Sequence, residues 1–173
     1  WRPFSPSLWP PVFGRVKPSA LDGVTLTSTP TPTPNPFDLS DRDGPQITSY
    51  SVSATEITVG DTVYFTFKGR DANYIHQFER RYIMPDGEPR NLSCSPISTF
   101  SGGAELTCTS HLKYTSAGTY KFQWIAGNDS VPEVGSNVSR YHPDGSIINH
   151  PIGGGSENIG THSFNTSDII VNP

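Results

Sequence analysis

Five histidines are the residues best suited to acid–base or metal chemistry, and three of them, His142, His150 and His162, fall within one stretch of the chain. None has the i, i+4 or short-strand spacing that brings two metal ligands together. Ser116 and Ser146 lie near glycines but outside any nucleophile-elbow pattern. The residues therefore predict that the protein is not an enzyme and that these histidines lie in solvated loops. A functional histidine cluster is the alternative.

Four aspartates could supply oxygen ligands near the start of the body: Asp38, Asp41, Asp43 and Asp71. Ca²⁺ takes several hard oxygen ligands, and acidic loops provide them. The spacing Asp-x-x-Asp-x-Asp-Gly departs from an EF-hand loop, because no acidic residue stands where the bidentate ligand belongs. We therefore predict no cofactor and no metal site. Calcium stays open as the alternative to an acidic, solvated turn.

The two cysteines, Cys94 and Cys108, lie symmetrically about Ser101, the centre of an expected hairpin turn. They should face each other on neighbouring strands, where a disulfide closing this short loop contributes about 3 kcal/mol. Such a bond implies an oxidising compartment, and hence an extracellular or cell-surface location. Two buried free thiols are the alternative.

Four N-glycosylation sequons are present, at Asn91, Asn128, Asn137 and Asn165. Together with a disulfide they predict covalently attached N-linked glycans on a secreted protein. O-linked sugar is expected in the Thr-Pro run, at Thr29, Thr31 and Thr33. The alternative is that these sites are unmodified.

The composition of the 173 residues excludes several classes of protein. Only 33% of the chain is hydrophobic and 16% is charged, whereas 11% is aromatic and the chain holds 17 Pro and 16 Gly. No apolar run approaches the roughly 18 residues of a membrane helix. The net charge of −4 gives no basis for nucleic-acid binding. An all-β, extracellular domain is therefore expected.

Residues 1–37 form an N-terminal arm of unusual composition, which holds nine of the 17 prolines. The Thr-Pro run over 29–36 predicts an extended, semi-rigid linker. Ahead of it, large apolar side chains are interspersed with proline: Trp1, Phe4, Leu8, Trp9, Val12 and Phe13. Val24 and Leu26 share one face of a short strand-like segment. The arm carries a net charge of +2, which leaves −6 on the rest of the chain.

The pattern of residues 38–173 predicts a β-sandwich. In 63–68, Val63, Phe65 and Phe67 alternate with polar residues, as a strand with one buried face requires. Tyr120, Phe122 and Trp124 alternate in the same way. Expected strands are 47–52, 63–68, 74–84, 91–99, 105–114, 120–125 and 163–171, with a long insertion at about 131–162.

Short motifs in this region resemble those of immunoglobulin-like modules in secreted microbial surface and adhesion proteins. Residues 43–47, 59–63 and 69–71 resemble the opening strands of such modules, and 116–122 resembles their penultimate strand. The resemblance covers about 43–127 and 163–173. It implies an immunoglobulin-like antiparallel β-sandwich and an extracellular location, but no particular activity. The arm and the insertion depart from the pattern.

The arm carries more large apolar side chains than a linker should, and it cannot bury them by itself. It could be disordered, fold back on its own sandwich, or dock on a neighbouring copy. We expect the arm to dock on the next subunit, with Trp1, Phe4, Leu8, Trp9, Val12, Phe13, Val24 and Leu26 as its contact residues. The protein would then be a structural subunit of an extracellular filament or surface assembly that polymerises head-to-tail, because a head-to-tail contact propagates. Its partners would be copies of itself, with no nucleic acid and no membrane span.

The alternative function is a carbohydrate-binding or adhesion module of a larger secreted protein. In that case exposed tyrosines would stack on sugar rings, and the candidates are Tyr64, Tyr74, Tyr82 and Tyr141.

Overall fold

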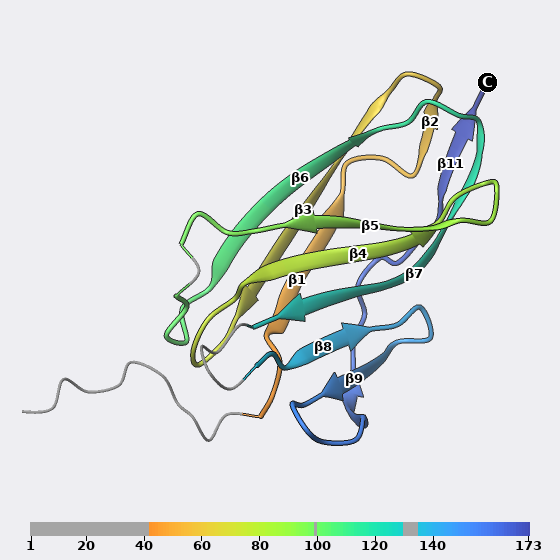
Figure 1. The fold of residues 1–173 in the computed structure, drawn as a ribbon. Helices are drawn as coiled ribbons and strands as arrows, with labels where there is room; N and C mark the ends of the chain where they lie inside the picture. Colours follow the sequence, from red (N-terminus) through yellow and green to blue (C-terminus); the bar gives the residue numbers. More distant parts are fainter. Residues whose placement is uncertain (1–41, 99, 130–134) are drawn as a thin grey trace, which may run out of the picture. The chain divides into compact units, whose positions relative to one another are not determined.

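The computed structural model describes residues 42–98, 100–129 and 135–173 (Figure 1). The predicted arm over 1–37, and the predicted boundary between arm and body, lie outside these residues. Within them all regular structure is β-strand, so the all-β prediction is confirmed. The strands are β1 (Gln46–Val52), β2 (Glu56–Thr58), β3 (Thr62–Arg70), β4 (Gln77–Ile83), β5 (Pro89–Cys94), β6 (Leu106–Lys113), β7 (Gly118–Asn128), β8 (Val138–Tyr141), β9 (Ser146–His150), β10 (Glu157–Thr161) and β11 (Ile169–Asn172).

The strands form two packed sheets, seen as two layers in Figure 1. The smaller sheet has the order β1-β3-β6 and is antiparallel throughout. In the larger sheet, β7 pairs with β4 on one side and with β8 and β11 on the other. β5 continues outward from β4, β9 and β10 continue from β8, and β2 pairs with β11 in parallel.

The predicted insertion is part of the larger sheet. From residue 138 onward it forms β8, β9 and β10, an antiparallel extension of β7. The predicted last strand, 163–171, is shortened to β11 (Ile169–Asn172). The amide and hydroxyl of Ser167 both donate to Asn165 Oδ1, and this local turn competes with strand pairing.

The core lies between the layers and is built from the alternating strands. Val63, Phe65 and Phe67 of β3 are fully buried, as the sequence pattern predicts. The Phe67 ring lies 5.1 Å from that of Tyr50 and stacks at 5.7 Å on that of Phe78 in the opposite sheet. Aromatic packing therefore joins the two layers.

The predicted alternation of Tyr120, Phe122 and Trp124 is interrupted by a β-bulge. Arg81 pairs with Trp124, whereas the next residue, Tyr82, pairs with Phe122, so β7 contains one extra residue. Phe122 is buried and Trp124 is only partly buried. A bulge reverses the face on which the following side chains lie, and here it moves Trp124 out of the core.

A charged residue occupies the centre of the core. Arg80 is 1% exposed, and its guanidinium lies 5.2 Å and 4.8 Å from the ring centres of Phe65 and Phe122. Nη1 donates to the Tyr50 hydroxyl at 2.5 Å and Nη2 to the Ser167 carbonyl at 3.3 Å. No carboxylate pairs with it among the described residues. Aromatic rings and neutral oxygens thus compensate this buried charge.

The disulfide between Cys94 and Cys108 is present, with a Cα–Cα distance of 6.0 Å. The predicted hairpin around it is wrong: among the described strands β5 pairs with β4 and β6 pairs with β3, so the chain passes from one sheet to the other between Cys94 and Leu106. The amides of Ser101, Gly102 and Gly103 donate to carbonyls of residues 71 and 73. These bonds hold the crossover, and the disulfide joins the two sheets.

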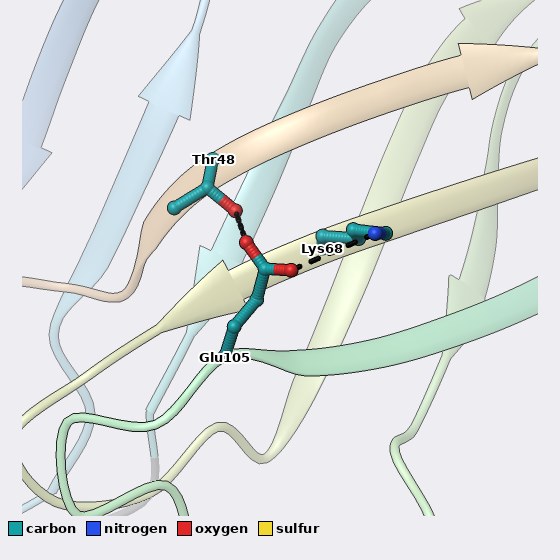
Figure 2. Close-up of polar contacts among 3 residues, drawn as sticks. All are labelled: Thr48, Lys68 and Glu105. Carbon is teal, nitrogen blue, oxygen red and sulfur yellow. Dashed lines mark hydrogen bonds and ion pairs between the residues drawn. The ribbon is translucent and has the colours of Figure 1, made fainter.

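A polar contact spans the outer surface of the smaller sheet (Figure 2). Thr48 Oγ1 donates to Glu105 Oε2 at 2.6 Å, and Lys68 Nζ lies 3.6 Å from Glu105 Oε1. The Thr48 hydrogen bond, aided by Lys68, lowers the pKa of Glu105. The contact is therefore complete above the ordinary pKa of a glutamate and weakens as the pH falls below it. It is solvent-exposed and contributes little to stability.

Candidate functional site

β1 has a free edge. It is the first strand of the smaller sheet and pairs only with β3, so its other side has no strand partner within the described ranges. A free edge presents unpaired backbone groups that an additional strand or peptide can bind. The register of β1 shifts between Ile47 and Ser49, which marks a bulge at this edge.

A hollow of about 350 Å³ lies beside this edge. Gln46, Ile47 and Thr48 form one wall, and the opposite wall comes from the β8–β9 hairpin and the segment after β10. Three rings pack there: the buried ring of Tyr141 lies 5.6 Å from that of Phe164, and His162, which like Phe164 is only partly buried, lies 5.0 Å from Phe164. We call the free edge of β1 with this hollow the β1 groove. An aromatic-lined groove beside a strand edge can bind an extended, proline-rich peptide.

Tyr141 connects the two walls of the β1 groove. Tyr141 is 2% exposed, and its hydroxyl oxygen accepts a hydrogen bond from the Ile47 amide at 2.7 Å. Burial raises the pKa of Tyr141 to about 12, although the Ile47 hydrogen bond opposes this shift. The phenol is therefore neutral throughout the physiological range.

Tyr141→Phe should lower the free energy of unfolding at neutral pH by about 1–3 kcal/mol, because the buried Ile47 amide loses its acceptor. The folded-state pKa of Tyr141 exceeds the ordinary value of 10.0. Its contribution is thus complete below pH 10 and is lost as the pH rises toward 12. The stability gap between wild type and variant should narrow over that interval. Urea unfolding followed across the alkaline range measures it, and a constant gap would contradict the assignment.

The chain enters the sandwich through a tightly held segment at residues 42–44. The Gly44 amide donates to Asn149 Oδ1 at 3.0 Å, and the Gly44 carbonyl accepts Ser139 Oγ at 2.9 Å. Asn149 Nδ2 donates to the Arg42 carbonyl and to Asp43 Oδ1. A Cβ at Gly44 would lie 2.4 Å from the Ser139 nitrogen, so only glycine fits here. Residues 42–44 are therefore fixed against β8 and β9.

The predicted contact residues of the arm, and Thr29, Thr31 and Thr33, lie outside the described residues. Of the sequon asparagines, Asn91 and Asn165 are exposed and Asn128 is partly buried. Asn137 is 1% exposed, and its Nδ2 donates to Asp129 Oδ2 at 2.9 Å. The folded body thus presents Asn91 and Asn165 most openly to a glycan.

The tyrosines proposed for sugar stacking have different environments. Tyr64 is 54% exposed, and Tyr74 packs edge-on against Phe100 at 5.2 Å. Tyr82 and Tyr141 are 7% and 2% exposed and belong to the core. The prediction that these two could stack on a ligand is wrong, because β4 and β8 direct them inward.

The histidines and aspartates considered as acid–base or metal-binding residues form hydrogen bonds within the body. His162 and the His142 carbonyl lie 2.7 Å apart, and His150 Nδ1 lies 2.5 Å from Ser156 Oγ. Asp71 Oδ1 accepts the Asn73 amide, and Asp38 and Asp41 lie outside the described residues. Across the part of the chain that the structure describes, no three His, Cys, Asp or Glu side chains group as metal ligands would.

Comparison with protein-family models, with curated proteins and with solved structures finds no match for this chain. Among the described residues there is also no helix long and apolar enough to cross a bilayer.

The β1 groove was not predicted from the sequence. Ile147, His162 and Phe164 fall in the predicted insertion and the strand after it, and their alternation with polar residues is short. The available signal was Phe164, a large aromatic residue placed between Ser and Asn just before a turn.

Proposed function

We propose that this chain is a structural subunit of an extracellular filament or surface assembly, in which the N-terminal arm of one subunit docks in the β1 groove of the next. The observation that carries the proposal is the free β1 edge beside an aromatic-lined hollow. The arm offers the matching chemistry, because it combines prolines with Trp1, Phe4, Trp9 and Phe13. Prolines cannot complete a backbone ladder, so the aromatic side chains would serve as anchors.

The length of the arm supports docking between subunits. Forty-one residues precede the described body. At about 3 Å per residue in a polyproline conformation, they can span on the order of 100 Å, well beyond one domain of this size. Opposite net charges, +2 on residues 1–37 and −6 on the rest, favour encounter. Val24 and Leu26 would add an edge strand beside β1.

We also propose that the body is immunoglobulin-like. In support, β1, β3 and β6 face a layer in which β5, β4, β7 and β11 follow one another, with β2 parallel to β11. The extra strands β8, β9 and β10 and a disulfide that ends on β5 and β6 depart from the usual pattern. The disulfide and the exposed sequons support an oxidising, extracellular location with attached glycans.

The docking proposal is tested with three full-length variants examined by electron microscopy. Thr161 is exposed at the rim of the β1 groove, so Thr161→Arg should block docking and abolish the assemblies. The arm variant Trp1→Ala/Phe4→Ala/Trp9→Ala/Phe13→Ala should do the same. Thr107→Arg is the matched control, because Thr107 is exposed on β6 outside the groove. Assemblies that survive Thr161→Arg, or that Thr107→Arg disrupts equally, would contradict the proposal.

A further inference from the structure

The outer face of the larger sheet carries an aromatic ring between two cations. Trp124 of β7 lies between Arg81 of β4 and Arg140 of β8, and the guanidinium carbons are 5.9 Å and 4.9 Å from its ring centre. The β-bulge in β7 places Trp124 on this face. Cation–π contacts at these distances hold both guanidinium groups in place.

Neutral partners orient both arginines. Arg81 Nε donates to Gln123 Oε1 at 3.2 Å, and Arg81 Nη1 donates to Asn91 Oδ1 at 3.1 Å. Arg140 Nη1 lies 3.4 Å from His150 Nε2, and Arg140 Nε is buried without a hydrogen-bond partner in the described part of the chain. No carboxylate forms an ion pair with either arginine in the described stretches. Two positive charges are thus ordered on this face without an ion-pair partner among the described residues.

An open hollow of about 450 Å³ adjoins the tryptophan. Its walls include Gln123, Trp124, His142, Pro143 and Asp144. Asp144 is exposed, and hydrogen bonds from Ser146 lower the pKa of this carboxyl group. The hollow therefore combines an aromatic edge, an amide and a carboxylate, which together can bind hydroxyl groups.

We propose that this face is a binding site for an acidic oligosaccharide containing uronate residues. Arg81 and Arg140 would bind the sugar carboxylates, since a guanidinium matches a carboxylate in geometry and charge. Gln123 and Asp144 would bind the hydroxyl groups of a ring lying against Trp124. Because the Asp144 carboxylate repels any anionic group, the sugar carboxylates would lie at the two arginines and only hydroxyl groups at the hollow. The site is independent of the β1 groove.

The experiment titrates full-length protein without N-linked glycans, because Asn91 adjoins Arg81, with oligogalacturonate in a calorimeter, at low and at physiological salt. Oligogalacturonate should bind, and its fully methyl-esterified form should bind at least tenfold more weakly because it lacks the carboxylate charge. Charge-assisted hydrogen bonds contribute about 1.5–3 kcal/mol, so Arg140→Gln should weaken binding by about tenfold to a hundredfold. Trp124→Leu should also reduce the affinity.

Arg90→Gln is the matched control. Arg90 is exposed on β5, and its register partner, Tyr82, belongs to the core, so this variant removes the same charge away from the outer face. It should leave the affinity within about twofold. The proposal is overturned if oligogalacturonate does not bind, if its esterified form binds equally well, or if Arg90→Gln weakens binding as much as Arg140→Gln. Inorganic sulfate that competes at equal concentration would instead show a general anion site.

Discussion

Arg80→Ala should lower the free energy of unfolding by about 3–5 kcal/mol, one of the largest effects expected of a single substitution here. Arg80 is 1% exposed and lies among core aromatic rings. Truncation leaves a cavity and removes the partner of the buried Tyr50 hydroxyl, which accepts Nη1 at 2.5 Å. Urea unfolding followed by tryptophan fluorescence measures the loss.

Two further variants separate the role of charge from that of volume. Arg80→Met preserves most of the volume, so it should cost less than Arg80→Ala. The hydroxyl of Tyr50 would still lose its partner, and Arg80→Met/Tyr50→Phe should recover part of that loss. An Arg80→Ala variant within about 1 kcal/mol of wild type would show that this guanidinium does not support the core.

Removing the disulfide should have the second large effect. The bond spans 14 residues, and a loop of this length contributes about 3 kcal/mol in the chain-entropy account. Cys94→Ala/Cys108→Ala should therefore reduce the free energy of unfolding by about that amount. The local stability of the segment between β5 and β6 should fall most, because the disulfide joins the two sheets there.

Amide hydrogen exchange shows which residues lose protection when the disulfide is removed. Intact and reduced wild-type protein serve as references. Amides of residues 101–103, which bond to residues 71 and 73, should exchange faster in the variant. The β9–β10 hairpin, which pairs away from the disulfide, should keep its protection. Uniform loss across the body, or no loss of stability, would contradict the view that the disulfide anchors the crossover.

Local alternation predicted much of the body. The buried face of β3 follows directly from Val63, Phe65 and Phe67, because strand periodicity depends only on neighbouring residues. Arg80 occupies a buried position between Phe78 and Tyr82 in the same kind of pattern. A charged residue is not expected at a buried position, so the alternation in β4 was not recognised from the sequence. The burial of Arg80 is stabilised by the surrounding rings and the Tyr50 hydroxyl, which are distant in sequence.

Long-range pairing could not be predicted in the same way. The spacing of Cys94 and Cys108 about Ser101 fits a hairpin and a crossover between sheets equally well, and the partners β4 and β3 decide between them. The bulge that turns Trp124 outward arises from pairing with β4 and leaves no local signal. Both candidate sites depend on such pairing, so neither could be read from the sequence.

Docking of the arm of one subunit in the β1 groove of another would build the proposed assembly. Sedimentation velocity of the full-length chain, beside a variant lacking residues 1–20, tests this most directly. We predict that the intact chain sediments as assemblies far larger than its 18.8 kDa mass and grows with concentration, while the truncated chain sediments as a folded monomer. An intact chain that stays at the mass of one subunit, or assemblies unchanged by the truncation, would contradict the account.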